Sequence, residues 1–253
     1  MRTLRDTWIV FTRYVGIHLR NPVWLVLGLL QPLVYLFLFA PLLVAVAKVP
    51  GFPSGGAFNV FVPGLIIQLG LFGAAFVGFS LISEAHFGLL ERLRVTPVSR
   101  VSLLLGRALR DVLNLVIGTL VLVLLSIPFG LSIRPLGLLV VLALQAMLGL
   151  FIVCISYSMA LWLHSEDSFA AVVTTATPPL LLLSGVLLPL TLAPVWLRDI
   201  AAANPLAYAV DAARAAFNNR LGDQSVIEGV VIVAVLAAVS TVVATRAFGR
   251  AVG

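Results

Sequence analysis

Residues 84–110 read EAHFGLLERLRVTPVSRVSLLLGRALR and interrupt a chain that is otherwise largely apolar. This segment holds five of the sixteen basic residues, and long apolar runs flank it on both sides. Because charged side chains cross hydrocarbon only at high cost, the segment must lie at one face of a membrane and connect two spans. Read as a helix, its first part has a polar side and an apolar side. One side carries the charged residues Glu84, Glu91 and Arg94 together with Phe87.

The apolar side of the same helix carries Leu89, Leu90 and Leu93. Thr96-Pro97 should end this helix and begin the next one, because threonine is a good N-cap and proline fits the first helical position. A short amphipathic helix with a sharp corner at the membrane surface suits docking onto a soluble partner. The simpler interpretation, a plain connector between two spans, accounts for the periodicity equally well.

Composition places the whole chain in a membrane. The 253 residues are 61% hydrophobic and 10% charged, with a mean hydropathy of +1.15. Soluble domains carry roughly 25% charged residues. The net charge of +6 does not indicate nucleic acid, because the basic residues cluster at the ends of apolar runs. The single Cys154 excludes an intramolecular disulfide. We therefore expect one membrane domain over residues 1–253.

The apolar runs predict an all-α polytopic protein with six transmembrane helices. The predicted spans cover about residues 22–47, 59–83, 111–131, 136–163, 168–190 and 226–245. With residues 84–110 on the cytoplasmic side, eleven basic residues lie inside and five outside, as the positive-inside rule requires. Both termini should then face the cytoplasm, and the protein should be a multi-pass protein of the cell membrane.

Residues 1–21 precede the first span and predict an amphipathic helix lying at the membrane interface. One stripe is apolar and the opposite side is polar. The apolar stripe consists of Leu4, Trp8, Phe11, Val15 and Leu19, and the polar side of Arg2, Asp6, Arg13 and Arg20.

Residues 191–225 are too polar and too rich in proline for a full span. Each charge at a helix centre costs about 2.5–3.5 kcal/mol on insertion scales. Two short helices forming a re-entrant hairpin on the exterior side, before the last span, fit this stretch better. We also expect Pro178-Pro179 to break the fifth span.

The amides inside predicted spans include Gln68, Asn114 and Gln145. They are candidates for a translocation path. For Gln68 and Gln145, a buried hydrogen bond between packed helices is the simpler interpretation.

The sequence lacks the motifs of the main enzyme classes. The only lysine, Lys48, is followed by Val49, so a P-loop is excluded. The three histidines form no HExxH pair, and no GxSxG motif occurs. Asp111 and Asp211 lie at predicted span edges beside arginines rather than as an intramembrane pair. We expect no catalytic, metal-binding or cofactor-binding site on this chain.

Several motifs in order resemble the permeases of type-2 ABC exporters, in the drug-resistance and lipid-exporting branch typified by the daunorubicin-resistance permease. They are RNP at 20–22, QP at 31–32, GLLERLRVTPVSR at 88–100, LLLGR at 103–107 and NPLAYAVDAAR at 204–214. Each motif alone is weak. Their order on a six-span plan, over nearly the whole chain, is the more specific signal.

The resemblance implies that a separate nucleotide-binding subunit holds ATP and Mg and hydrolyses ATP. It also implies that two permease subunits pair, with a homodimer favoured over a heterodimer. The family pattern E-x-L-x-x-T-P matches Glu91, Leu93, Thr96 and Pro97, so the coupling helix would run from Glu84 to Arg94. Ala85–Phe87 lacks the charges common before that pattern. The residues implied in ATPase coupling are Glu84, Phe87, Leu90, Glu91, Arg92, Leu93, Arg94, Thr96 and Pro97, with Trp8, Phe11, Arg13 and Arg20 on the interfacial helix.

The sequence therefore predicts the transmembrane subunit of an ABC exporter that moves a drug, lipid or lipid-linked compound outward between faces of the second and fifth spans. The alternative is an ATP-independent carrier or channel. Such proteins usually place an ionisable residue in mid-membrane, and none lies in the first, third, fourth or fifth predicted span. A structural membrane scaffold is the third interpretation.

Overall fold

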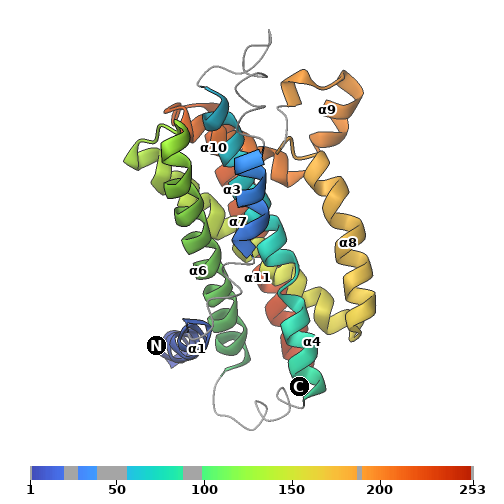
Figure 1. The fold of residues 1–253 in the computed structure, drawn as a ribbon. Coiled ribbons are helices and arrows are strands. Elements are labelled where there is room, and N and C mark those ends of the chain that lie inside the picture. The colour runs from blue at the N-terminus through green and yellow to red at the C-terminus, as the bar shows by residue number, and fades with distance from the viewer. Residues whose placement is uncertain (1, 20–27, 39–55, 88–98, 187–189, 252–253) are drawn as a thin grey trace.

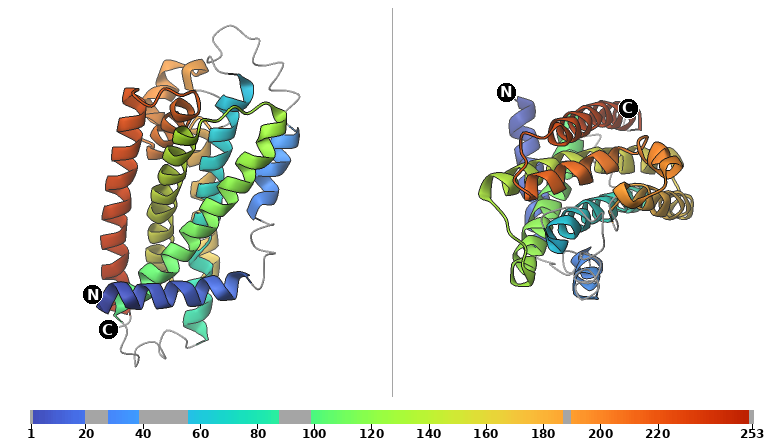
Figure 2. Two further views of the ribbon diagram at one scale, coloured as in Figure 1. Left: turned by 90° about the vertical axis from the view of Figure 1, so that its left-hand side faces the viewer. Right: turned by 90° about the horizontal axis from the view of Figure 1, so that it is seen from above.

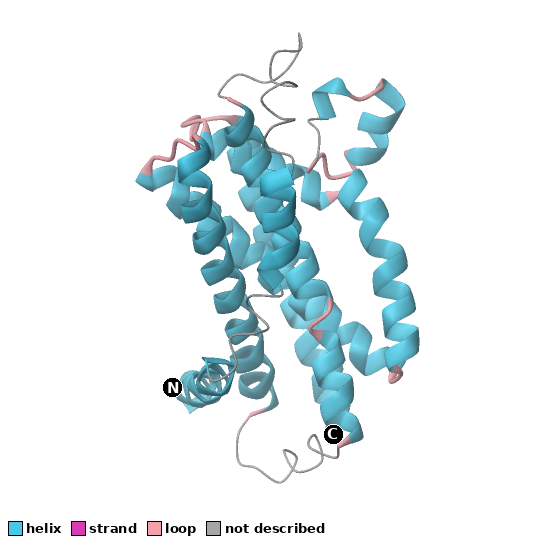
Figure 3. Ribbon diagram, in the orientation of Figure 1, coloured by secondary structure: helices cyan, strands magenta, loops and turns pink. Residues whose placement is uncertain are grey.

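The structure is a computed structural model that describes residues 2–19, 28–38, 56–87, 99–186 and 190–251. All regular secondary structure in these residues is helical (Figure 3). The helices are α1 (Arg2–Leu19), an unlabelled helix (Gly28–Leu38), α3 (Ala57–Ala75), α4 (Gly78–His86), α6 (Arg100–Ser126), η1 (Ile127–Phe129), α7 (Pro135–Leu163), α8 (Glu166–Leu182), η2 (Leu190–Leu192), α9 (Val195–Ala201), α10 (Pro205–Phe217) and α11 (Gln224–Ala251).

Four helical stretches of the described residues are long and apolar enough to cross a membrane. They are Ala57–His86, Arg100–Phe129, Pro135–Leu163 and Gln224–Arg250. They coincide with the second, third, fourth and last predicted spans, so the all-α polytopic class is confirmed. Of the first predicted span, the structure describes the apolar helix Gly28–Leu38. The fifth corresponds to α8, which has 17 residues.

The long helices stand side by side, and short helices lie at the two ends of the bundle (Figure 1). At one end α1 lies across the bundle and packs on α6 (Figure 2). The last turn of α11 reaches the same end, where the Arg100 guanidinium donates to the carbonyl oxygen of Gly249 at 2.8 Å. At the other end lie α9 and α10. We call these the α1 end and the α10 end.

Burial distinguishes central helices from peripheral ones. Every residue from 61 to 70 of α3 is buried, because α3 packs against α6, α7 and α10. Helix α11 instead buries a stripe at helical spacing that includes Val233, Ala237 and Ala244, while Val239 and Val243 are exposed. A helix with apolar residues on its exposed side suits lipid as the surrounding solvent.

The second predicted span is not one helix, because the chain turns at Phe76-Val77 between α3 and α4. The cause is Ser156 of α7. Its hydroxyl donates to the carbonyl oxygen of Ala75 at 2.7 Å and accepts from the amide of Gly78 at 2.9 Å. A side chain inserted into the backbone hydrogen-bond ladder is a recognised cause of helix kinks.

Two further predictions about helix ends are wrong. Helix α6 begins at Arg100 with Ser99 as its N-cap, not at Thr96-Pro97, and residues 100–110 belong to it rather than to a separate connecting segment. Two of their arginines tolerate this because each is paired with a carboxylate, Arg107 with Glu84 and Arg110 with Asp111. Helix α8 also continues through Pro178-Pro179 to Leu182. Prolines are tolerated inside membrane helices because neighbouring groups can satisfy the carbonyl oxygens that they leave without a backbone donor.

In residues 191–225 the two expected short helices are α9 and α10. Asn204 caps α10 through the amide of Leu206, and Pro205 occupies its first turn. One glycine on α7 and one on α11 let these helices approach the backbone of α10 closely. A Cβ at Gly137 of α7 would lie 2.5 Å from Ala216 O, and one at Gly229 of α11 would lie 2.6 Å from Tyr208 O.

The close approach at Gly229 makes a testable prediction. Replacing Gly229 with alanine should push α11 away from α10 and lower the free energy of unfolding by about 1–3 kcal/mol, the usual cost of overpacking. The measurement is the thermal unfolding temperature of the purified protein in detergent. Gly16 of α1 is the matched control, because nothing lies within 4 Å of its added Cβ. Gly16→Ala should be neutral or stabilising, and an equal loss for both variants would contradict the packing argument.

Candidate functional site

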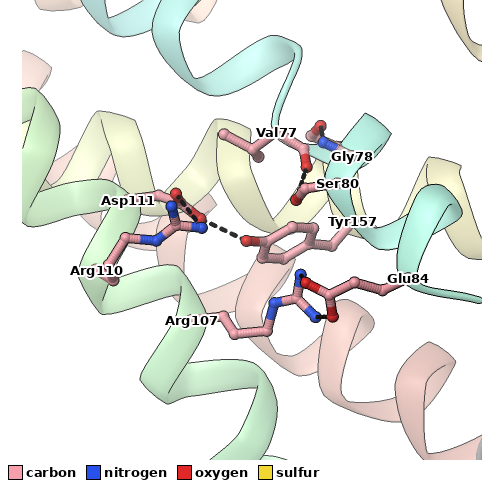
Figure 4. A network of polar contacts seen from close by, with 9 residues as sticks. Val77, Gly78, Ser80, Glu84, Arg107, Arg110, Asp111 and Tyr157 are labelled. Carbon is pink, nitrogen blue, oxygen red and sulfur yellow. Dashed lines mark hydrogen bonds and ion pairs between the residues drawn. The ribbon is translucent and has the colours of Figure 1, made fainter. Parts of the chain in front are cut away.

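The most concentrated cluster of charged side chains among the described residues joins α4, α6 and α7 at the α1 end (Figure 4). Its centre is Arg107 of α6, only 2% exposed. The guanidinium donates to both carboxylate oxygens of Glu84, in the last turn of α4, at 2.5 and 2.8 Å. A bidentate pair of this kind fixes orientation as well as distance, because the planar guanidinium matches the carboxylate.

A second pair lies one turn further along α6. Arg110 contacts the Asp111 carboxylate at 2.9 Å, and the hydroxyl of Tyr157 on α7 donates to the same carboxylate. Both Asp111 and Tyr157 are buried. Asp111 therefore joins α6 to α7 rather than facing water at the edge of a span.

The N-terminal helix joins this cluster through an aromatic ring. The guanidinium carbon of Arg107 lies 5.2 Å from the centroid of the Tyr14 ring, and that of Arg110 lies 5.9 Å from it. The same Arg107 carbon lies 5.6 Å from the centroid of Tyr157. Such cation–π contacts contribute about 0.5–2 kcal/mol each. Next to them, α1 crosses α6 at Gly106, where a Cβ would lie 2.6 Å from Val10.

Four helices thus meet in one cluster, which we name the Arg107 cluster: Tyr14 of α1, Glu84 of α4, Arg107, Arg110 and Asp111 of α6, and Tyr157 of α7. Its chemistry is not catalytic in form, because each carboxylate is paired with an arginine. Among the described residues, no group of three or more His, Cys, Asp or Glu side chains could hold a metal ion. What the cluster does is couple the positions of four helices.

Residues predicted for ATPase coupling have different places in the structure. Glu84 belongs to the Arg107 cluster. Phe87, which caps α4, is 79% exposed. The expected helix from Glu84 to Arg94 is interrupted, since α4 ends at His86. Leu90, Glu91, Arg92, Leu93, Arg94, Thr96 and Pro97 lie outside the described residues.

On α1, the predicted apolar stripe divides, because Leu4 and Trp8 are exposed while Phe11 and Val15 are half-buried. Trp8 is 64% exposed and its ring lies 5.3 Å from that of Phe11, while Val10 and Tyr14, on a neighbouring face, contact α6. Arg13 is exposed and Arg20 lies outside the described residues.

The three interior amides also differ. Gln68 and Gln145 are fully buried, and their amide atoms have no hydrogen-bond partner among the described residues. Asn114 is half-buried on α6. Gln145 packs against Gly70, where an added Cβ would lie 2.9 Å from its amide. The helix-packing hydrogen bond predicted for Gln68 and Gln145 is therefore not made by the described residues.

Sequence reasoning missed a second buried arginine at the α10 end. Arg214 donates to Val60 O at 2.9 Å and to Gly185 O at 2.7 Å, which ties α10 to α3 and to the segment after α8. Burial lowers the pKa of Arg214 to about 10, with the Asp211 carboxylate 3.8 Å away opposing that shift. It therefore stays charged at neutral pH. Both arginines end motifs that the sequence analysis had singled out, Arg107 in LLLGR and Arg214 in NPLAYAVDAAR.

Comparison with known proteins gives consistent matches. The family model described as ABC-2 type transporter matches residues 5–218. A ycf38 transport permease of Porphyra purpurea is 31% identical over 79% of this chain and 69% of its own length, and that of Cyanophora paradoxa is 30% identical over 77% and 68%. A doxorubicin-resistance ABC transporter permease, DrrC, of Mycobacterium tuberculosis is 27% identical over 84% and 75%.

The Arg107 cluster makes a testable prediction. Glu84→Gln leaves the buried Arg107 charge without its counter-ion, so the free energy of unfolding should fall by roughly 3 kcal/mol. The exchange Glu84→Arg with Arg107→Glu should recover part of that loss. Thermal unfolding in detergent measures both.

Asp223→Asn is the matched control, because it breaks an exposed pair with Arg220 at 3.3 Å. It should cost less than about 1 kcal/mol. A loss of that small size for Glu84→Gln, or an exchange variant less stable than either single variant, would contradict the role given to the pair.

Proposed function

This chain belongs to the ABC-2 type transporter family, and from that membership we propose how its helices couple ATP hydrolysis to export. It is a transmembrane permease subunit of an ABC exporter, and the family implies an ATP-binding subunit as its partner. The family supplies the permease component of these transporters, which is generally non-catalytic.

We propose six spans over the ranges given by the sequence, with both termini in the cytoplasm and the bundle in the cell membrane. The shared position of α1 and the end of α11 at one end of the bundle supports an even number of crossings (Figure 1). In this orientation α1 lies at the cytoplasmic interface. The exposed Trp8 and Leu4 support that place, because an apolar stripe left free by the bundle is what the bilayer surface binds. Helices α9 and α10 form the exterior re-entrant hairpin.

We propose that the ATP-binding subunit docks on the segment after α4 and on α1. The Glu84–Arg107 pair is the observation that carries this proposal, because it joins the start of that segment to the buried part of α6. Movement of the segment would pull Glu84, and Arg107 would pass the displacement to α1 through Tyr14 and to α7 through Tyr157. The exposed Phe87 supplies an apolar contact for the partner.

We propose that two copies pair and move a hydrophobic or amphipathic molecule, such as a drug, lipid or lipid-linked compound, outward. Two relatives are named for doxorubicin and daunorubicin resistance, which supports this substrate class. Helix α8 supports a route beside the fifth span, because it buries only Phe169, Val173 and Thr177 and leaves most of its surface free. ATP and Mg would bind the partner subunit, and this chain would bind no cofactor. Its only lysine, Lys48, does not belong to a P-loop motif.

The test is biochemical. The purified chain alone should hydrolyse no ATP above background, and co-expressed with its ATP-binding subunit it should co-purify in a roughly equal ratio, as one docking surface for each subunit requires. Phe87→Ala should reduce the amount of ATP-binding subunit recovered, because it removes a contact at the proposed docking surface. Trp196→Ala is the control, since Trp196 is similarly exposed but lies on α9 at the α10 end. ATP hydrolysis by the isolated chain would refute the division of labour, and equal losses for both variants would refute the docking surface.

A further inference from the structure

A cavity of about 200 Å³ lies between α3, α7, α8 and α10. It extends from Asn204 and Leu206 at the start of α10 to Ser156 and Met159 of α7, at the level of the turn between α3 and α4. Exposed residues of α7 and α8, namely Ile155, Val172 and Leu180, border it. The cavity therefore opens on the outer surface of the bundle.

Nearly all of the lining is aliphatic or aromatic, and none of the described residues that line it is charged. Its three principal polar side chains already use their hydrogen bonds. Ser156 bonds Ala75 O and Gly78 N, the Thr177 hydroxyl donates to Val173 O, and the Asn204 amide donates to Leu180 O at 2.7 Å. Each of these side chains is therefore already hydrogen-bonded within the protein.

An apolar cavity of this size does not hold water well. A cavity of about 150 Å³ lined by Leu, Ile and Phe stays dry and binds small apolar molecules. The present cavity opens between α7 and α8 at membrane depth, where the surrounding solvent is hydrocarbon. The electrically neutral lining complements a ligand without charge or dipole. Its elongated course along the helices suits a chain rather than a compact ring system.

We propose that this cavity binds one acyl chain of a bilayer phospholipid. The inference requires only that the bundle lies in a bilayer and does not depend on the proposed route of ATP coupling. A bound chain would fill the space between α8 and the α3–α7 pair, and would hold α8 beside the bundle where few protein contacts do so.

The experiment uses the full chain in phosphatidylcholine nanodiscs that contain a trace of phosphatidylcholine with a diazirine in one acyl chain. After irradiation, mass spectrometry maps the adducts. Adducts should concentrate on Phe151, Ile155 and Met159, and should exceed those on Val239 and Val243 of α11, which are exposed but outside the cavity.

Ala176→Phe should fill the cavity from α8. The added ring would occupy space that the acyl chain otherwise fills, so adducts at Phe151 and Met159 should fall to the yield found on Val239 and Val243. Ala171→Phe is the control, because Ala171 is exposed on the same helix and does not line the cavity. It should leave those adducts unchanged. Val172→Phe, also at the border, gives a second filling variant if Ala176→Phe fails to fold.

Equal adduct yields on the cavity residues and on α11 would overturn the proposal, as would cavity adducts that persist in a folded filling variant. Cavity adducts in the monomer that disappear in the assembled dimer would also overturn it, because a second copy would then occupy the site. None of these outcomes involves ATP or the partner subunit, so they are independent of the test of the proposed function.

Discussion

The buried charge of Arg107 is the constraint on which the α1 end of the bundle depends. A guanidinium that is only 2% exposed must have partners within the protein, because water does not reach it. Glu84 neutralises the charge, while Tyr14 and Tyr157 present their ring faces to it. Each partner comes from a different helix, so the need to pair the Arg107 charge fixes the relative positions of α1, α4, α6 and α7. Such a pair adds little net stability, but it penalises strongly any arrangement that separates its members.

At the α10 end, the buried Arg214 likewise joins several segments, but its partners are backbone carbonyl oxygens. Arg214 is satisfied by the carbonyl oxygens of Val60, Gly185 and Val186. Gly185 and Val186 follow the end of α8, where carbonyl oxygens lack helical donors, and the arginine supplies donors to them. Between these two ends the helices are joined mainly by apolar packing and by few hydrogen bonds, such as those of Ser156. This arrangement favours rigid ends and an adjustable middle, where the cavity beside α8 lies.

Much of the fold was predictable, because membrane spans depend on long apolar runs that are visible in any window of the sequence. Four spans follow from this pattern, α1 follows from its apolar stripe, and the two short helices before the last span follow from the charges and prolines of residues 191–225. The kink at Phe76-Val77 was not predictable, since its cause is a serine on a helix far away in sequence. The predicted start of α6 was wrong because residues 100–110, with their arginines, were expected to lie in a connecting segment at the membrane face. In fact Arg107 is paired with a carboxylate on α4, and no local pattern identifies that partner.

The most direct test measures whether the Arg107 cluster transmits movement. Spin labels at Thr12 of α1 and Trp162 of α7, both exposed, would report their separation in the complex with the ATP-binding subunit, with Cys154 replaced. On addition of a non-hydrolysable ATP analogue, the distance distribution should shift in the wild-type complex. In a Glu84→Gln complex that still binds its ATPase, that shift should be lost. A full wild-type shift in the Glu84→Gln complex would contradict the account.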